Sequence, residues 1–264
     1  FEEATERNRF ASESRRNCAI VLQELGKIDE AVEKIEEAIL LDSLCDERSL
    51  EPAINLMLHG NFMSVKGFDE RADASYSRAI QVSPDFAEAH FHLGRLNYSR
   101  GEWSKAIDNF GSAVSLDDTN EDFWIALIGT LPHVTFEEYN PNLDYFFSQM
   151  IGHQISQVSN LCIPIMAALR KHPFIESNLQ YQTISVENVD EMLSELSKIK
   201  PLLELLELTP ITDLEMEMFF VKLRSAMLQR VLKDSSEVTA PEFYLALSSQ
   251  CFINEYIYDI TSEE

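Results

Sequence analysis

Small and large residues recur along the first half of the chain at a fixed spacing. Five positions return 34 residues later: Gly60, Gly67, Ala72, Tyr76 and Ala79 as Gly94, Gly101, Ala106, Phe110 and Ala113. Small residues let two antiparallel helices approach closely, and large residues fill the space between successive helices. A 34-residue period of this kind indicates a helical solenoid built from pairs of helices.

A further pair of helices is predicted upstream, at Ser12–Cys45, with Gly26, Ala31, Ile35 and Ala38 at the repeat positions. The spacing from Ala31 to Ala72 is 41, so seven extra residues are placed in Asp46–Pro52. That segment is either a partner-contacting loop or a surface insertion, which costs little entropy. Gly67 and Gly101 are expected to end the first helix of their pairs in a left-handed conformation. Capping boxes are predicted at Asp85–Glu88, Thr135–Glu138, Thr212–Glu215 and Thr239–Glu242.

After about residue 120 the period is lost and prolines become frequent, but the pattern remains helical. We therefore predict two domains, a repeat domain over 1–120 and a non-repeating helical domain over 121–264. Glu121–Leu131 is expected to cap the last repeat, with Trp124 and Leu127 facing inward. A helix from Asp213 to about Leu232 is expected to bury one face, made of Leu214, Met218, Val221, Leu228 and Val231. Tyr181–Val186 is the one strand candidate, so the predicted class is all-α.

The repeat resembles the tetratricopeptide family. The best unit runs from Ala87 to Asn120 and has, in the family's order, Leu93-Gly94, Tyr98, Gly101, Ala106, Phe110 and Ala113. The unit over Ala53–Phe86 matches as well, whereas the upstream unit has Ala19 where the family usually has glycine. The resemblance implies a solenoid of about three repeats.

In that family the first helix of each repeat lines a concave groove, so the resemblance implies where this chain binds a protein or an extended peptide. The main candidates are Arg16, Met57, Asn61, Ser64, Phe91, Arg95 and Tyr98. The same register adds Glu13, Ile20, Gln23, Ile54, Val65, Glu88 and Ser99. Asn61 and Arg95 are equivalent positions whose amide and guanidinium could grip a peptide backbone or carboxylate. The groove is either open in this way or covered internally by residues 121–264.

Composition and motifs narrow the function classes. The net charge is −24, which disfavours binding to phosphate backbones and so general nucleic-acid binding. No apolar stretch is long enough to span a bilayer. Cys18, Cys45, Cys162 and Cys251 are far apart in sequence, which favours buried, reduced thiols in a cytoplasmic protein over a metal site. No closely spaced glycines suit a nucleotide or S-adenosylmethionine, so no cofactor or metal and no enzymatic activity are expected of this chain.

The second half is similar to a helical region that precedes the catalytic domain in bacterial S-adenosylmethionine-dependent methyltransferases containing tetratricopeptide repeats. The similar segments are Phe136–Phe147, Pro201–Leu232 and Pro241–Asp259, and Gln250–Tyr256 is the most specific. The resemblance implies that a catalytic domain lies downstream in a larger protein. Phe252 and Tyr256 share a helical face that we expect to be buried within the helical half.

Two function classes follow. One is a non-catalytic module that recruits a protein partner or substrate, as the N-terminal part of a larger methyltransferase. The other is a structural or oligomerisation scaffold whose groove is internally occluded.

Overall fold

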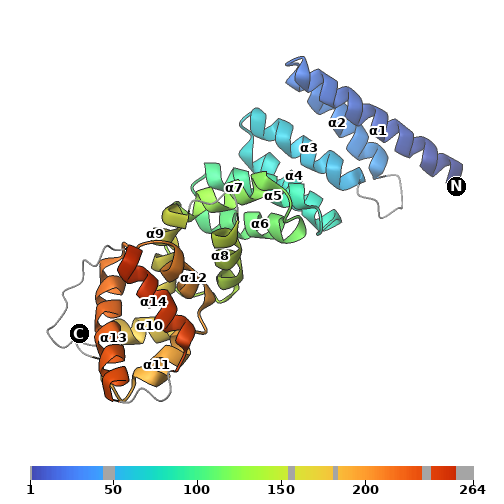
Figure 1. Cartoon of the computed structure of the whole chain (residues 1–264). Coiled ribbons are helices and arrows are strands. Elements are labelled where there is room, and N and C mark those ends of the chain that lie inside the picture. Colours follow the sequence, from blue (N-terminus) through green and yellow to red (C-terminus); the bar gives the residue numbers. More distant parts are fainter. Residues whose placement is uncertain (1, 44–50, 154–157, 181–183, 234–238, 254–264) are drawn as a thin grey trace. The chain divides into compact units, whose positions relative to one another are not determined.

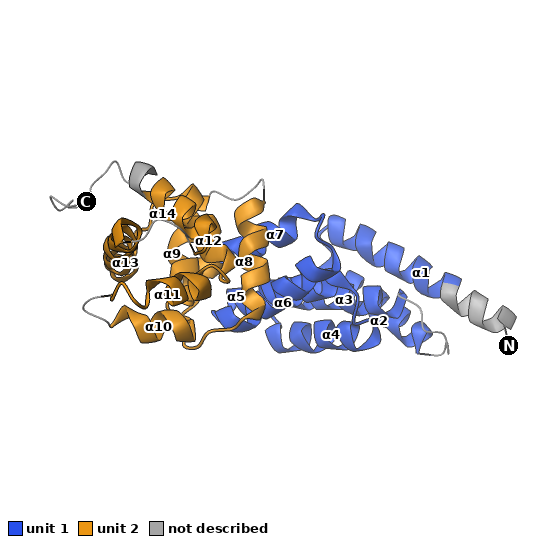
Figure 2. Ribbon diagram, turned by 60° about the horizontal axis from the view of Figure 1, so that its bottom comes forward, with its two compact units in different colours: residues 1–130 blue, residues 131–264 orange. Residues whose placement is uncertain are grey.

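The chain forms helices and connecting turns throughout the part that the structure describes (Figure 1). The computed structural model describes all residues except 1, 44–50, 154–157, 181–183, 234–238 and 254–264, and the side chains of 2–9 and 251–253 are also left aside. The described residues contain no strand, which confirms the all-α class. They form two compact units, Phe1–Thr130 and Leu131–Glu264 (Figure 2), which are described separately.

The first unit consists of three helix pairs followed by a single helix. The pairs are α1 (Glu2–Glu24) with α2 (Ile28–Asp42), α3 (Glu51–Val65) with α4 (Asp69–Val82), and α5 (Ala87–Ser99) with α6 (Trp103–Leu116). The single helix is α7 (Glu121–Thr130), which contacts α5 and α6. Trp124 and Leu127 of α7 are buried, as expected of a helix that caps the last repeat.

The same turn joins the two helices of every pair. Gly26, Gly67 and Gly101 have φ of 74°, 75° and 74° and lie just after the first helix, which confirms the role expected of Gly67 and Gly101. At each turn the amide after the glycine donates to a carbonyl in the last turn of the helix, at 2.9 Å, as Phe68 does to Met63. This closes a Schellman motif. The chain then enters the second helix without any side-chain cap.

Close packing within the second and third pairs depends on a glycine that faces an aromatic ring. A Cβ added at Gly60 would lie 2.5 Å from the Tyr76 ring, and one added at Gly94 would lie 2.7 Å from the Phe110 ring. The first pair has Ala19 and Ile35 at these positions, both fully buried. The smaller aliphatic partner leaves room for the alanine methyl group. The first unit is thus a tetratricopeptide-type helical solenoid of three repeats.

The second unit contains a short 3-10 helix and seven α-helices among its described residues. They are η1 (Leu131–His133), α8 (Asn142–Gly152), α9 (Val158–Leu169), α10 (Pro173–Leu179), α11 (Val189–Leu196), α12 (Lys200–Leu208), α13 (Leu214–Lys233) and α14 (Pro241–Ile253). The α12 helix contacts α8, α9 and α14, so it lies at the centre of this unit.

A buried side chain joins two of these helices at the centre of the second unit. The Gln250 amide, 1% exposed, donates from α14 to the carbonyls of Leu206 and Thr209 at 2.5 and 2.6 Å. Its Oε1 accepts from the Ile211 amide at 3.3 Å. Gln250 thereby satisfies backbone groups at the C-terminal end of α12, which a helix otherwise leaves without partners.

The expected buried face of α13 is wrong. Leu214 and Met218 are 68% and 51% exposed, and Leu228 is exposed as well. The buried residues of this helix are Met216, Phe219, Phe220, Leu223, Ala226 and Met227. Both sets recur at helical spacing, so periodicity alone could not choose between two apolar stripes, and the two adjacent aromatic residues decide the orientation.

Three of the expected capping boxes are wrong. Phe86 precedes α5 and provides no side-chain cap, while Asp85 accepts a hydrogen bond from Ser83. The α13 helix is capped by Asp213, whose Oδ1 accepts from the Met216 amide at 3.0 Å, rather than by Thr212. No helix begins at Thr135. These positions have the right residue types but not the local backbone that a cap requires.

Several other expectations concern residues at the edges of the described segments. Residues 46–50 of the insertion, 181–183 of the strand candidate, Cys45 and the side chains of Cys251, Phe252 and Tyr256 lie outside what the structure describes. Residues 184–186 form no strand. Cys162 is buried as expected, whereas Cys18 is exposed, contrary to expectation.

Candidate functional site

A polar pocket in the first unit is lined by residues from the first helices of all three repeats. It has a volume of about 370 Å³ and is lined by Gln23, Asn61, Ser64, Val65, Tyr76, His92, Arg95, Leu96 and Ser99. The α1, α3 and α5 helices contribute eight of these residues, and Tyr76 reaches the pocket from α4. No acidic side chain is among the lining residues.

Asn61 is held in one orientation at the floor of the pocket. The Tyr76 hydroxyl donates to Asn61 Oδ1 at 2.7 Å, and Asn61 Nδ2 lies 3.2 Å from the Met57 sulfur. Burial raises the pKa of the Tyr76 hydroxyl well above its usual range, so this group stays protonated and remains a donor. The amide nitrogen of Asn61 therefore faces away from Tyr76 and has a second hydrogen for a ligand.

Arg95 is the cation of the pocket and stands at the repeat position equivalent to Asn61. Its guanidinium carbon lies 5.8 Å from the centre of the Phe91 ring, a cation–π contact. The side chain is exposed, and among the described residues no carboxylate lies within ion-pair distance of it. A guanidinium left without an acid in a chain of net charge −24 is a ready site for an anionic group.

His92 forms one wall of the pocket as a neutral imidazole. Its ring stacks on the Tyr76 ring, with centroids 5.8 Å apart and an interplanar angle of 12°. Burial, together with the positive charge of Arg95, lowers the pKa of His92 to about 4. At neutral pH His92 contributes hydrogen-bonding capacity without adding charge. His90, two residues earlier, points elsewhere and contacts the carbonyl of Pro84 at 3.1 Å, as their spacing predicts.

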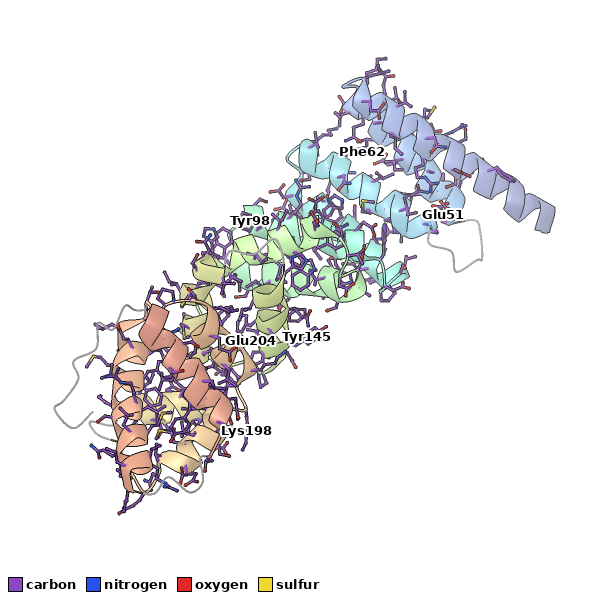
Figure 3. All side chains as sticks on the ribbon, in the orientation of Figure 1. Glu51, Phe62, Tyr98, Tyr145, Lys198 and Glu204 are labelled. Atoms are coloured by element: carbon purple, nitrogen blue, oxygen red, sulfur yellow. The ribbon has the colours of Figure 1, made fainter. Side chains whose placement is uncertain are left out.

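The structure brings only some of the expected groove residues together. Asn61, Ser64 and Arg95 line the pocket, as do Gln23, Val65 and Ser99 from the wider set. Met57 lies beneath Asn61 and contacts its amide. Tyr98, labelled in Figure 3, is at the end of α5 and packs edge-on against Trp103 with ring centroids 4.9 Å apart.

Two expected groove residues have structural contacts of their own. Arg16 forms an ion pair with Glu51 at the start of α3, and its side chain is only 12% exposed. Phe91 packs between two rings, with centroids 5.8 Å from Phe110 and 4.9 Å from Phe123 of α7. The α7 helix therefore covers Phe91, and the pocket begins one helical turn further on, at Arg95.

Tyr76, His92 and Leu96 also line the pocket but were not predicted to do so. Tyr76 occupies a repeat position whose equivalent, Phe110, is pure core, so its hydroxyl gave no recognisable signal. His92 follows directly after Phe91 and lies on the side of α5 that meets α4. The rings of Tyr76 and His92 come together only because α4 packs against α5, and this contact is not visible in the sequence.

The second unit has a larger pocket of about 730 Å³, lined by apolar side chains and by several charged side chains. Two of its three lining cations form ion pairs, Arg170 with Asp213 and Glu215, and Lys171 with Glu176; the third is Lys222. Its lining also includes the carboxylates of Glu176 and Glu215, so this pocket is less selective for an anion than the one at Arg95.

The described residues contain no group of three or more His, Cys, Asp or Glu side chains that could hold a metal ion. His59, the other buried histidine of the repeats, is packed between helices, with Nδ1 at 2.8 Å from the Ser75 hydroxyl. None of the described helices has the length and hydropathy needed to cross a membrane.

Comparison with known proteins gives partial likenesses. No family model matches the chain. The chain is 32% identical over 82 residues to the protein O-mannosyl-transferase TMTC3 of Homo sapiens, a match that covers 31% of this chain and 9% of that protein. The chain thus spans less than a tenth of this relative's length.

Solved structures with similar folds were also found. YrrB, described as a TPR protein with an unusual peptide-binding site, has a TM-score of 0.44 and 18% identity, covering 76% of this chain and 92% of YrrB. MamA has a TM-score of 0.39 and 14% identity, covering 90% of this chain and 99% of MamA. Naa15/Naa10 bound to HypK-THB has a TM-score of 0.38 and 13% identity, covering 92% of this chain and 39% of that one. The repeat assignment rests on the recurring turns and glycine–aromatic contacts described above.

Proposed function

We propose that the first unit is a non-catalytic protein-interaction module that binds an extended segment of a partner protein in its concave pocket. A carboxylate of that segment, from an Asp or Glu side chain or a chain terminus, engages Arg95. The observation that supports this proposal is the exposed Arg95 guanidinium in a pocket without acidic lining residues. No described carboxylate pairs with this cation, which is otherwise hard to account for in a chain with 45 acidic residues.

The polar groups around Arg95 suit a peptide backbone. The fixed Asn61 amide offers a donor on one side, while Ser64 and Ser99 offer hydroxyls at the rim. A guanidinium binds a carboxylate through two parallel hydrogen bonds, which fixes direction as well as charge. Leu96 and Val65 add apolar area for a neighbouring side chain.

The test is selection of peptides from a random display library on the full chain, followed by affinity measurements with the selected peptides. We expect the peptides to share an acidic residue or a free C-terminal carboxylate. Arg95→Ala should weaken their binding by about tenfold or more, equivalent to roughly 1.4 kcal/mol. Lys105→Ala is the matched control, because it removes a cation from α6 outside the pocket and should change affinity less than about twofold. Equal binding to wild type and Arg95→Ala would refute the proposal.

The alternative function is a structural or oligomerisation scaffold with an occluded groove. It is favoured by one observation, the cover that α7 provides over Phe91. If this function holds, library selection on the full chain enriches no peptide, and Phe123→Ala on α7 exposes Phe91 and creates binding where wild type has none.

We also propose that this chain is the N-terminal, recruiting part of a larger S-adenosylmethionine-dependent methyltransferase. The support is the resemblance of residues 121–264 to the helical region that precedes such catalytic domains. The Gln250 contacts with α12 give one residue of the most specific segment a structural role. The reading frame downstream of Glu264 tests this: a glycine-rich turn between a strand and a helix is expected, and its absence rules the idea out.

A further inference from the structure

The α1 helix has an uncharged stripe along one exposed face, which we call the α1 stripe. It consists of Phe10, Ser14, Asn17, Cys18, Val21 and Leu25, all of them exposed. The spacing of four, three and four residues places Phe10, Ser14, Asn17 and Val21 in one row of the helix. Phe10, Val21 and Leu25 are 70%, 54% and 67% exposed. Three large apolar side chains in one exposed row are unusual for the surface of a single subunit.

The middle of the equivalent face is covered by a helix in the other two repeats, whereas Lys66 and Asp85, which are equivalent to Leu25 and Phe10, are exposed there. Val21 is equivalent to Phe62 and Leu96, which stand 41 and 75 residues later and are 0% and 4% exposed. Ser14 is equivalent to Asn55 and Ala89, both fully buried. Phe62, labelled in Figure 3, packs with Ile35 and Ala38 of α2. The α1 stripe is therefore the one face of this type, among the three first helices, that lacks a covering helix in the described chain.

Charge makes the α1 stripe suitable for contact between two copies of this chain. A quarter of all residues are charged and each copy has a net charge of −24, so two copies repel each other over most of their surfaces. No residue of the α1 stripe is charged. The nearby cations are engaged within their own subunit, Arg15 with Glu37 and Arg16 with Glu51.

The α1 stripe is also complementary to itself when two helices run antiparallel. In that arrangement Phe10 lies opposite Leu25 of a second copy, Ser14 opposite Val21, and Asn17 opposite Cys18. The two largest side chains, Phe10 and Leu25, thus pack against each other, and Val21 packs against the small Ser14. Polar Asn17 lies at the centre of the pair. A two-fold axis requires such self-complementarity, because the same patch contributes both sides of the contact.

We propose that the α1 stripe is a homodimerisation surface, in which the α1 helices of two copies pair antiparallel with Cys18 close to the two-fold axis. The groove of each copy lies on the side of α1 that contains Gln23. Each dimer therefore has two such pockets, one in each copy, whatever ligand they take.

The first test is the mass of the full chain by light scattering over a range of concentrations. Wild type, 30.2 kDa as a monomer, should double in mass as the concentration rises toward about 1 mM, the weakest dissociation constant considered. Val21→Glu should be monomeric throughout, because two carboxylates then face the pair. Val82→Glu is the matched control: Val82 is 50% exposed on α4, outside the stripe, and this variant should dimerise as wild type does.

The second test uses Cys18 itself. Oxidation of the full chain with diamide, which takes up the two hydrogen atoms released by the paired thiols, should give a disulfide-linked dimer that Cys18→Ser lacks. Circular dichroism of each variant verifies that its helices are intact. A wild-type chain that is monomeric at about 1 mM, or a dimer that survives Val21→Glu, would overturn the proposal.

Discussion

The two units of this molecule differ in the kind of contact that stabilises each of them internally. In the first unit the same backbone turn and the same glycine-to-ring contact recur from repeat to repeat, at Gly60 with Tyr76 and Gly94 with Phe110. In the second unit the decisive contacts occur once, such as the Gln250 hydrogen bonds to the end of α12. Repetition makes a contact visible in the sequence, whereas a contact that occurs once can be recognised only when its partners are known.

The largest expected effect concerns α13, where sequence and structure choose opposite faces. Leu223→Ala should destabilise the second unit by roughly 2–5 kcal/mol, because Leu223 is fully buried. Met218→Ala, on the face that the sequence pattern favoured, should change the free energy of unfolding by less than about 0.5 kcal/mol. Urea unfolding of both variants gives the comparison. A larger loss for Met218→Ala would restore the sequence-based face.

The next effect concerns a contact that occurs once. Gln250→Met keeps the side-chain volume but leaves the carbonyls of Leu206 and Thr209 buried without a donor, at a cost of roughly 2–4 kcal/mol. Amide hydrogen exchange at the end of α12 should accelerate. Gln229→Met, at an exposed position of α13, is the matched control. If both variants unfold at the same urea concentration, Gln250 is not what joins α14 to α12.

Overpacking the repeat contact should have a somewhat smaller effect. Ala106 and Ala113 are both fully buried in α6, so Ala106→Leu and Ala113→Leu should each cost roughly 1–3 kcal/mol. Ser104→Leu, exposed on the same helix, should be nearly neutral. Thermal unfolding measures all three. Melting of both alanine variants within a degree of wild type would show that the repeat register is wrong.

The smallest expected effect is a dependence of the free energy of unfolding on pH, caused by His92 in the pocket. The pKa of His92 is about 4 in the folded chain, against an ordinary value near 6.5 when unfolded. Below pH 6.5 the unfolded state therefore binds a proton that folded His92 does not, and stability falls as the pH falls toward 4. Between pH 7 and pH 6 the free energy of unfolding of wild type should fall by about 0.7 kcal/mol more than that of His92→Gln does. Identical pH profiles for the two proteins would indicate that His92 is solvated.

The sequence predicted the contacts that recur from repeat to repeat and missed those that occur only once. The repeated pattern of glycine, alanine and large residues located the three helix pairs and their glycine turns, and the 34-residue spacing made Asn61 and Arg95 equivalent positions. It could not show that Arg16 turns toward Glu51, because ion pairs between repeats depend on the distance between helices. Nor could it place Tyr76 in the pocket, since the ring satisfies the packing rule and only the hydroxyl contacts Asn61.

The pair of equivalent rings, Tyr76 and Phe110, has a consequence for how such a groove can change. Each ring covers the glycine of its own repeat, and they differ by a single oxygen atom. In Tyr76 that atom donates a hydrogen bond to Asn61 in the pocket, whereas Phe110 has no hydroxyl to offer the equivalent Arg95, which instead lies over the Phe91 ring. If the pocket binds a peptide as we propose, exchanging tyrosine and phenylalanine at this position would alter ligand preference while leaving the helix packing intact. The packing that stabilises a repeat and the hydrogen bonding in its pocket can therefore vary independently, because one hydroxyl oxygen changes the second without changing the first.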